Sequence, residues 1–179
     1  MMRDYSAFFS PSLSNEIPIS KQFSWWEEFI LYFVSNCNTF CIECFSNSLS
    51  GLQSCAKMGA QNIAQRLANG RIEMWEGEVC QRFVYELAQD PFCQQRNLLK
   101  WDRVFLRHGQ HTLVSITLGG AEISLHGLTK RDLQFAFDVL QPYDIPLCYW
   151  ENVESGRTVP IRESFQYNAD LNDLFGKGE

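Results

Sequence analysis

Three cysteines at short, regular spacing are the residues of this chain best suited to chemistry. Cys37, Cys41 and Cys44 follow the pattern C-x3-C-x2-C. Thiolate sulfur is a ligand for zinc and for iron–sulfur clusters. Cys55 could add a further sulfur, and His108 and His111, which flank an expected turn, could add imidazole. The spacing therefore allows a metal centre that holds iron or zinc.

The same three cysteines resemble the cluster-binding motif of the radical S-adenosylmethionine enzymes. In that family three thiolates hold three irons of a [4Fe–4S] cluster. The resemblance covers only the residues from Cys37 to Cys44. It implies an iron–sulfur enzyme in which Cys37, Cys41 and Cys44 are the ligands.

The spacing also has a purely structural interpretation, which we favour. Residues at i, i+4 and i+7 lie on one face of an α-helix, and cysteine behaves as a small apolar side chain when it is buried. No nucleophile-elbow, phosphate-binding, zinc-protease or dinucleotide-binding motif occurs in the chain. We therefore assign no catalytic residue and no required cofactor, and keep an iron–sulfur or zinc protein as the alternative.

Aromatic residues near the N-terminus form the second candidate site. Trp25 and Trp26 are adjacent, so on a helix they point in different directions, and Trp25 is exposed if Trp26 joins the core. Together with Phe8, Phe9 and Phe23, an exposed Trp25 would form an anchor patch for a partner protein. In the alternative arrangement, the N-terminal arm folds back and covers Trp25 within the same chain.

Composition and charge exclude several classes of protein. Hydrophobic residues make up 45% of the 179 residues and aromatic residues 14%, which is enough to form a core and excludes extensive disorder. The net charge is -6, the isoelectric point is about 5.1, and no basic stripe occurs. A protein that tracks nucleic-acid phosphates is thus disfavoured, and a basic partner is favoured.

The cysteine count and the N-terminus bear on location. Seven cysteines is an odd number, and the first residues lack the apolar run of a secretory signal. We expect reduced thiols and a cytoplasmic protein. The longest apolar run, 29–34, is too short to span a membrane.

The first half of the chain predicts about three helices. Ser24 and Glu27 form a capping-box pattern, and apolar residues then recur at three- and four-residue steps up to Cys44. Further helices are expected over 49–68, ending at Asn69-Gly70, and over 72–89, ending before a proline. Residues 1–20 show no such period and are expected to form an irregular arm.

The second half predicts an antiparallel sheet. Apolar and polar residues alternate over 111–118 and 121–126, and glycine-containing turns join these strands to one over 101–108. Thr129 and Asp132 begin an amphipathic helix that covers the sheet. Two further strands are expected over 145–150 and 158–165, and a short helical turn over 169–175.

The predicted fold class is therefore α+β. An irregular arm (1–20) precedes an N-terminal helical segment of about three helices (21–90), and an antiparallel sheet of about five strands covered by an amphipathic helix comes after it (91–179). The two segments are expected to pack as one domain. The element order from 72 onward looks like that of the small acidic dimeric chaperones of bacterial secretion systems, a likeness that implies an apolar surface for an unfolded partner.

The sequence thus predicts a non-enzymatic protein-binding module: an adaptor, a chaperone-like protein or a regulator. It would act through exposed aromatic and apolar surface on a partner that is basic or presents an apolar segment, and we also expect self-association. The alternative is an enzyme or metalloprotein that uses Cys37, Cys41 and Cys44.

Overall fold

The computed structural model describes residues 4–11, 17–66, 71–93 and 95–152. Elements in the first half are β1 (Asp4–Phe9), α1 (Ile19–Gln22), α2 (Trp26–Val34), β2 (Thr39–Phe45), α3 (Leu49–Lys57), β3 (Gln61–Arg66), β4 (Ile72–Glu78) and α4 (Gln81–Ala88). The second half adds β5 (Phe92–Cys93), β6 (Leu98–Leu99), β7 (Arg103–His108), β8 (His111–Thr117), β9 (Glu122–Leu128), α5 (Lys130–Leu140) and β10 (Cys148–Asn152), with 3-10 turns η1 (Leu118–Gly120) and η2 (Gln141–Tyr143).

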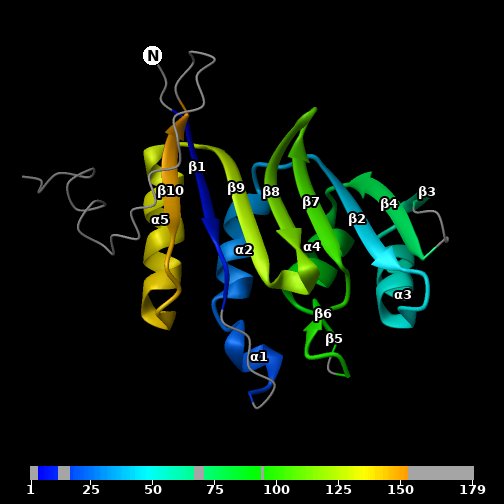
Figure 1. Ribbon diagram of the computed structural model, residues 1–179. Coiled ribbons are helices and arrows are strands. Elements are labelled where there is room, and N and C mark those ends of the chain that lie inside the picture. The colour runs from blue at the N-terminus through cyan, green and yellow to red at the C-terminus, as the bar shows by residue number, and fades with distance from the viewer. Residues whose placement is uncertain (1–3, 12–16, 67–70, 94, 153–179) are drawn as a thin grey trace, which may run out of the picture.

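Eight strands form one sheet in the order β10-β1-β9-β8-β7-β2-β4-β3 (Figure 1). Every neighbouring pair is antiparallel. The first and last of the described strands lie side by side, because β1 is inserted between β10 and β9. Ala7 of β1 therefore faces Tyr149 on one side and Leu125 on the other.

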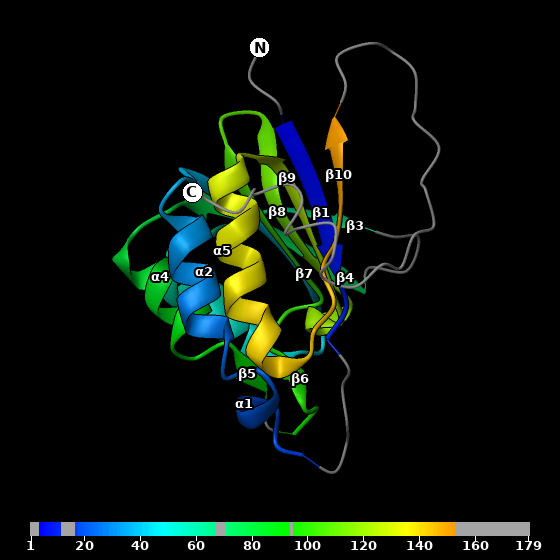
Figure 2. The same ribbon diagram turned by 90° about the vertical axis from the view of Figure 1, so that its left-hand side faces the viewer.

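The helices pack on one face of this sheet. Figure 2 shows α2, α4 and α5 together on the same side of the strands, and α3 contacts β2 and α4. The core fills the space between the two layers; its sheet side includes Tyr5, Ala7, Phe9, Phe40, Ile42, Cys44, Val104, Leu106, Val114, Ile116, Ile123 and Leu125. The described elements leave the opposite face of the sheet uncovered, and we call it the open face.

The expected N-terminal segment of about three helices over 21–90 is wrong. That range contains β2, β3 and β4 as well as short helices, so helices and strands alternate along the chain. The expected irregular arm includes β1, which lies inside the sheet. The eight-stranded sheet thus draws on both predicted segments, and it is larger than the expected sheet of about five strands.

β2 is the strand whose sequence was wrongly predicted to be helical. Its residues Phe40, Ile42 and Cys44 alternate toward the helices as a strand requires, but Cys41 and Glu43 on the open face are buried as well. A central strand that is buried on both faces loses its simple period of two, and its apolar residues then also fit a helical spacing. The predicted helix up to Cys44 arose from this ambiguity.

The predicted helix over 72–89 merged two elements. Residues Ile72–Glu78 form β4 and Gln81–Ala88 form α4. Gly77 lies in the strand, where a Cβ atom would stand 2.6 Å from Cζ of Phe40. This glycine permits the close approach of β4 to the Phe40 ring, and it is also a poor helix former.

Within the larger sheet, the antiparallel pairing predicted for the three central strands is confirmed. β7, β8 and β9 form the expected antiparallel meander. Thr129 caps α5 in a capping box with Asp132, as the sequence predicted. The covering layer, however, contains α2, α3 and α4 in addition to α5. In place of the strand expected over 145–150, the structure has β10, which begins three residues later and ends two residues later. The expected strand over 158–165, the helical turn over 169–175 and the Asn69-Gly70 stop lie outside the described residues.

Among the residues that the structure describes, no helix is long and apolar enough to cross a bilayer.

Candidate functional site

The predicted aromatic anchor is largely buried. Phe9, Phe23 and Trp25 are each at most 2% exposed. The ring of Trp25 stacks on Phe23 at 5.2 Å and meets the edge of Phe9 at 5.6 Å, so β1 and the aromatic residues around α2 cover Trp25 within the chain. Phe8 points to the open face and is half-buried. Phe9, Phe23 and Trp25 thus form a core cluster that presents little surface to a partner, and Phe8 lies on the other face of the sheet.

The three cysteines of the C-x3-C-x2-C pattern do not converge. Cys37 follows α2, where its thiol contacts the Phe33 carbonyl oxygen. Cys41 lies on the open face of β2 and Cys44 on the face toward the helices. Residues three apart on a strand must lie on opposite faces. No group of three or more His, Cys, Asp or Glu in the described parts of the chain is placed to hold a metal.

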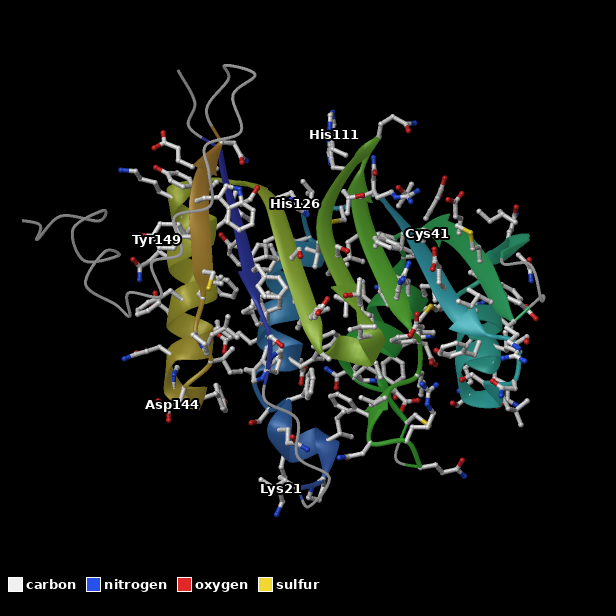
Figure 3. The ribbon with its side chains drawn as sticks, in the orientation of Figure 1. Lys21, Cys41, His111, His126, Asp144 and Tyr149 are labelled. Carbon is white, nitrogen blue, oxygen red and sulfur yellow. The ribbon has the colours of Figure 1, made fainter. Side chains whose placement is uncertain are left out.

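Two of these cysteines, Cys37 and Cys41, are poorly suited to nucleophilic catalysis. Burial raises the pKa of Cys37 to about 11 and, against the lowering effect of Arg107, that of Cys41 to about 11. Both thiols are therefore protonated at neutral pH, whereas the thiolate is the nucleophile. The histidines do not assist them: His108 contacts the Asn36 carbonyl oxygen, and Figure 3 places His111 at the tip of β8, away from Cys41.

A buried polar network links α3 and α4 to Lys100, the residue that follows β6. Ser54 donates a 2.6 Å hydrogen bond to Glu86, and the Lys100 ammonium lies 3.6 Å from Glu86 and 2.6 Å from Asp90. Ser54, Glu86 and Lys100 are all at least nine-tenths buried. The serine hydroxyl and the ammonium are already engaged with carboxylates, Glu86 in the interior and Asp90 at the surface. We assign this network to structure.

The open face is a mixed surface of aromatic, small polar and charged residues. One residue from each strand lies in a single row, namely Cys148, Phe8, Ser124, Ser115, Phe105, Cys41, Glu76 and Gln61. Arg107 pairs with Glu76 at 3.2 Å and Arg103 with Glu43 at 3.5 Å. The charges beside Cys41 are thus paired with one another, and Figure 3 shows this face toward the viewer.

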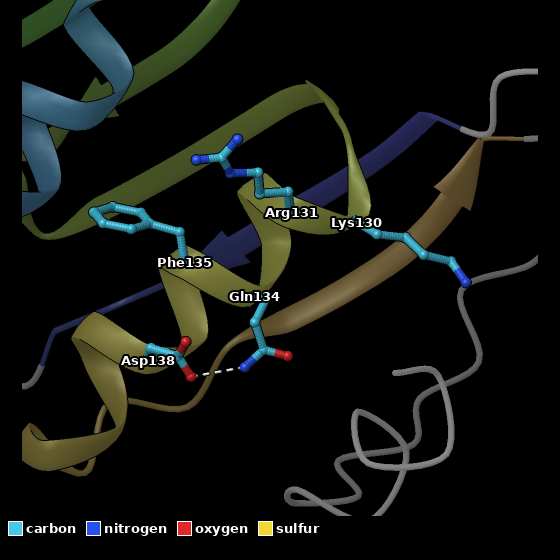
Figure 4. Close-up of a pocket in the computed structure, with 5 residues that line it drawn as sticks. All are labelled: Lys130, Arg131, Gln134, Phe135 and Asp138. Carbon is cyan, nitrogen blue, oxygen red and sulfur yellow. Dashed lines mark hydrogen bonds between the residues drawn. The ribbon is translucent and has the colours of Figure 1, made fainter. Parts of the chain in front are cut away.

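Among the described residues, two grooves lie on the helical side. The first, of about 310 Å³, runs along the exposed side of α5 and is lined by Lys130, Arg131, Gln134, Phe135 and Asp138 (Figure 4). Its wall is a single helix, and Gln134 donates to Asp138 across it. Phe135 is held from behind by the ring of Tyr32, stacked at 3.7 Å.

The second groove runs between α2 and α4 and has a volume of about 450 Å³. Its lining residues are Leu31, Val79, Cys80, Gln81, Val84, Tyr85, Ala88 and Gln89. Leu31 is 41% exposed and Tyr85 60% exposed, whereas Ala88 is buried. We call this feature the α2–α4 groove.

Antiparallel packing of the two helices creates the α2–α4 groove. The Trp26 indole N–H at the start of α2 donates to the Leu87 carbonyl oxygen near the end of α4, at 2.8 Å. Phe83 anchors the other end of α4 by stacking on Phe40 of the sheet at 3.9 Å. With these residues turned inward, the helical period turns Leu31 and Tyr85 outward along the groove.

The two ends of the α2–α4 groove differ in charge. Glu27 and Glu28 are exposed one turn before Leu31, and Glu27 accepts a hydrogen bond from Gln89 of the groove lining. At the opposite end, Arg82 is exposed one turn before Tyr85. The groove therefore combines an apolar floor with one acidic end and one basic end.

Sequence patterns did not single out Leu31, Val84 or Tyr85. A signal for the tyrosine was present, because Phe83 and Leu87 were expected to face the core and Tyr85 then falls on the outer side of the same helix. The pairing of α2 with α4 had no comparable signal, since it joins segments far apart in the chain.

No protein-family model, curated protein or solved structure matches this chain. The likeness in element order to secretion chaperones therefore has no structural support, and it carries no argument about function.

Proposed function

We propose that the protein is a non-enzymatic interaction module that binds an amphipathic helix of a partner protein in the α2–α4 groove. The observation that carries the proposal is the pair of exposed side chains, Leu31 and Tyr85, on either side of one apolar groove. Exposed apolar grooves between helices are the usual receptors for amphipathic helices, and tyrosine is enriched among interface hot spots.

The dimensions of the groove fit this ligand. α2 has nine residues, so this wall is about 13 Å long at 1.5 Å per residue. Such a length accepts roughly two and a half turns of a helix, with apolar anchors at i, i+4 and i+7.

The charges at the ends of the α2–α4 groove favour one kind of partner helix. Glu28 at the acidic end attracts a basic end of the ligand, and the net charge of -6 favours approach of a basic partner. We therefore commit to an amphipathic helix that has apolar anchors and a lysine-rich end beside Glu28.

The test uses a fluorescent peptide of roughly 15 residues with leucines at the anchor spacing and lysines at one end. Fluorescence anisotropy should show binding to the full chain, and Tyr85→Ala should weaken it at least about tenfold, the usual effect of losing a hot spot. Tyr143→Ala is the matched control, because Tyr143 is 43% exposed but lies outside the groove.

Electrostatic selection is tested in the same assay. A peptide with glutamates in place of its lysines should bind more weakly to the wild type, and Glu28→Lys should remove the preference for the lysine peptide. The proposal fails if Tyr85→Ala binds the lysine peptide as tightly as the wild type, or if Tyr143→Ala weakens binding equally.

A further inference from the structure

Two fully buried cysteines lie next to each other where α3 packs on β2. Cys44 is on the helix-facing side of β2 and Cys55 is in α3, and both are 0% exposed. The Cβ atom of Cys44 is 3.4 Å from the position that a Cβ atom on Gly51 would take. Cys55 follows Gly51 by four residues and so lies on the same face of α3, one turn further on.

Contact between the two thiols completes this arrangement. A hydrogen bond joins the side chains of Cys55 and Cys44. The remaining cysteines have other surroundings: Cys41 lies on the opposite face of β2, Cys37 contacts the Phe33 carbonyl oxygen, and Cys80 the Met58 carbonyl oxygen. Among the seven cysteines, all of them described, Cys44 and Cys55 are therefore the pair placed for a covalent bond.

We propose that Cys44 and Cys55 form an intrachain disulfide when the folded protein meets a peroxide. One sulfur attacks a peroxide oxygen and the O–O bond breaks. This step releases one water and converts that cysteine to a sulfenic acid. The second sulfur then attacks the sulfenic sulfur, the S–O bond breaks, and a second water leaves. Two thiols are oxidised to one disulfide while hydrogen peroxide is reduced to two waters.

The bond would tie β2 to α3, and through Ser54 to α4. Ser54, next to Cys55, donates to Glu86 of α4. The hydrogen bond between Cys44 and Cys55, together with burial, raises the pKa of Cys55. Because the thiolate is the more reactive form, the reaction is expected to be slow at neutral pH and faster at higher pH.

Peptide mapping tests the proposal cleanly. Cleavage after glutamate and lysine releases residues 44–57, a peptide that contains Cys44 and Cys55 and no other cysteine. The native full chain is treated with hydrogen peroxide, quenched with catalase, and then unfolded in the presence of iodoacetamide. The peptide should lose two hydrogen masses and carry no alkyl group, whereas the untreated protein should give the doubly alkylated peptide.

Two controls separate native geometry from chance pairing. Oxidation in guanidinium should give mixed linkages that include Cys41, because the folded arrangement is lost. Cys93→Ala, which removes another buried cysteine, should leave the modified peptide unchanged, whereas Cys55→Ala should abolish it. The proposal is overturned if peroxide treatment of the native wild type leaves peptide 44–57 doubly alkylated, or oxidised to sulfinic or sulfonic acids.

Discussion

Cys41 occupies an unusual place for a thiol on an uncovered sheet face. Its side chain is 0% exposed between Arg107, Glu76 and Glu43. Burial is the main cause that raises its pKa to about 11, from an ordinary value of 9.0, and the two carboxylates add to the effect while Arg107 opposes it. The folded protein therefore holds this thiol protonated at a pH where the unfolded chain has released the proton.

This difference predicts a loss of stability at high pH. A group whose folded pKa is raised stabilises the fold fully below its unfolded pKa, and the contribution is lost as the pH rises through the folded value. The urea midpoint should thus fall between pH 9 and about pH 11, and Cys41→Ala should flatten part of that fall. Thiolate absorbance should follow the titration.

The matched control for Cys41 is Cys80→Ala, since the Cys80 thiol is exposed. It should leave the slope of stability against pH unchanged. If the urea midpoint falls equally steeply with pH in the wild type and in Cys41→Ala between pH 9 and about pH 11, the raised pKa of Cys41 is contradicted.

Among the elements, α3 is fitted tightly against its neighbours. A Cβ atom on Gly51 would stand 2.7 Å from the backbone carbonyl oxygen of Lys100 and 3.0 Å from Oγ of Ser48. Replacing an interior helical glycine by alanine normally gains about 1 kcal/mol of stability. Here the carbonyl oxygen belongs to the backbone beside β6, which cannot move without shifting that strand.

Gly51→Ala is therefore expected to destabilise the protein by about 1 to 3 kcal/mol, the usual cost of overpacking. Ser50→Ala, at the half-buried neighbouring position of the same helix, should change stability little. Urea unfolding measures both variants. A Gly51→Ala protein as stable as the wild type would show that α3 is less closely packed than these distances require.

The elements also differ in how far the sequence could predict them. β8 and α5 carry strong local signals, namely alternation with one polar face and a capping box of Thr129 with Asp132. β2 and β4 carry weak ones, because β2 is buried on both faces and every residue of β4 from Ile72 to Gly77 is half-buried, so neither strand shows a clear alternation. Periodicity works where one side of an element faces water, and it fails where both sides are covered.

At the scale of the whole molecule, the sheet order depends on contacts between distant segments. β1 pairs with β10 and β9, and β2 lies between β7 and β4. No local pattern specifies such pairings. The α2–α4 groove depends on them too, because it exists only once Trp26 and Leu87 have met. The outward side of α4 was thus predictable from its phase, but the groove was not.

The network around Lys100 and Glu86 joins three of these distant segments. Lys100→Met removes the buried ammonium beside Glu86 and leaves Lys57, a largely exposed lysine 3.6 Å away, as the remaining cation at that carboxylate. Because a buried charge that has lost its buried partner is destabilising, we expect this variant to cost about 3 kcal/mol. The double variant Lys100→Met/Glu86→Leu should recover much of this loss, because neither charge then remains buried. Urea unfolding of Lys100→Met, Glu86→Leu and the double variant gives the coupling free energy between the two residues. Losses of stability that simply add in the double variant would contradict a structural pairing.

Protection of one thiol tests the proposed binding site most directly. Cys80 is exposed and lines the α2–α4 groove, whereas Cys148 is half-buried on the open face of β10. Alkylation by iodoacetamide, measured by mass spectrometry with and without the saturating lysine peptide, reports on both sites at once. We predict slower alkylation of Cys80 and an unchanged rate at Cys148. An unchanged rate at Cys80 while the peptide is bound would contradict binding in the α2–α4 groove.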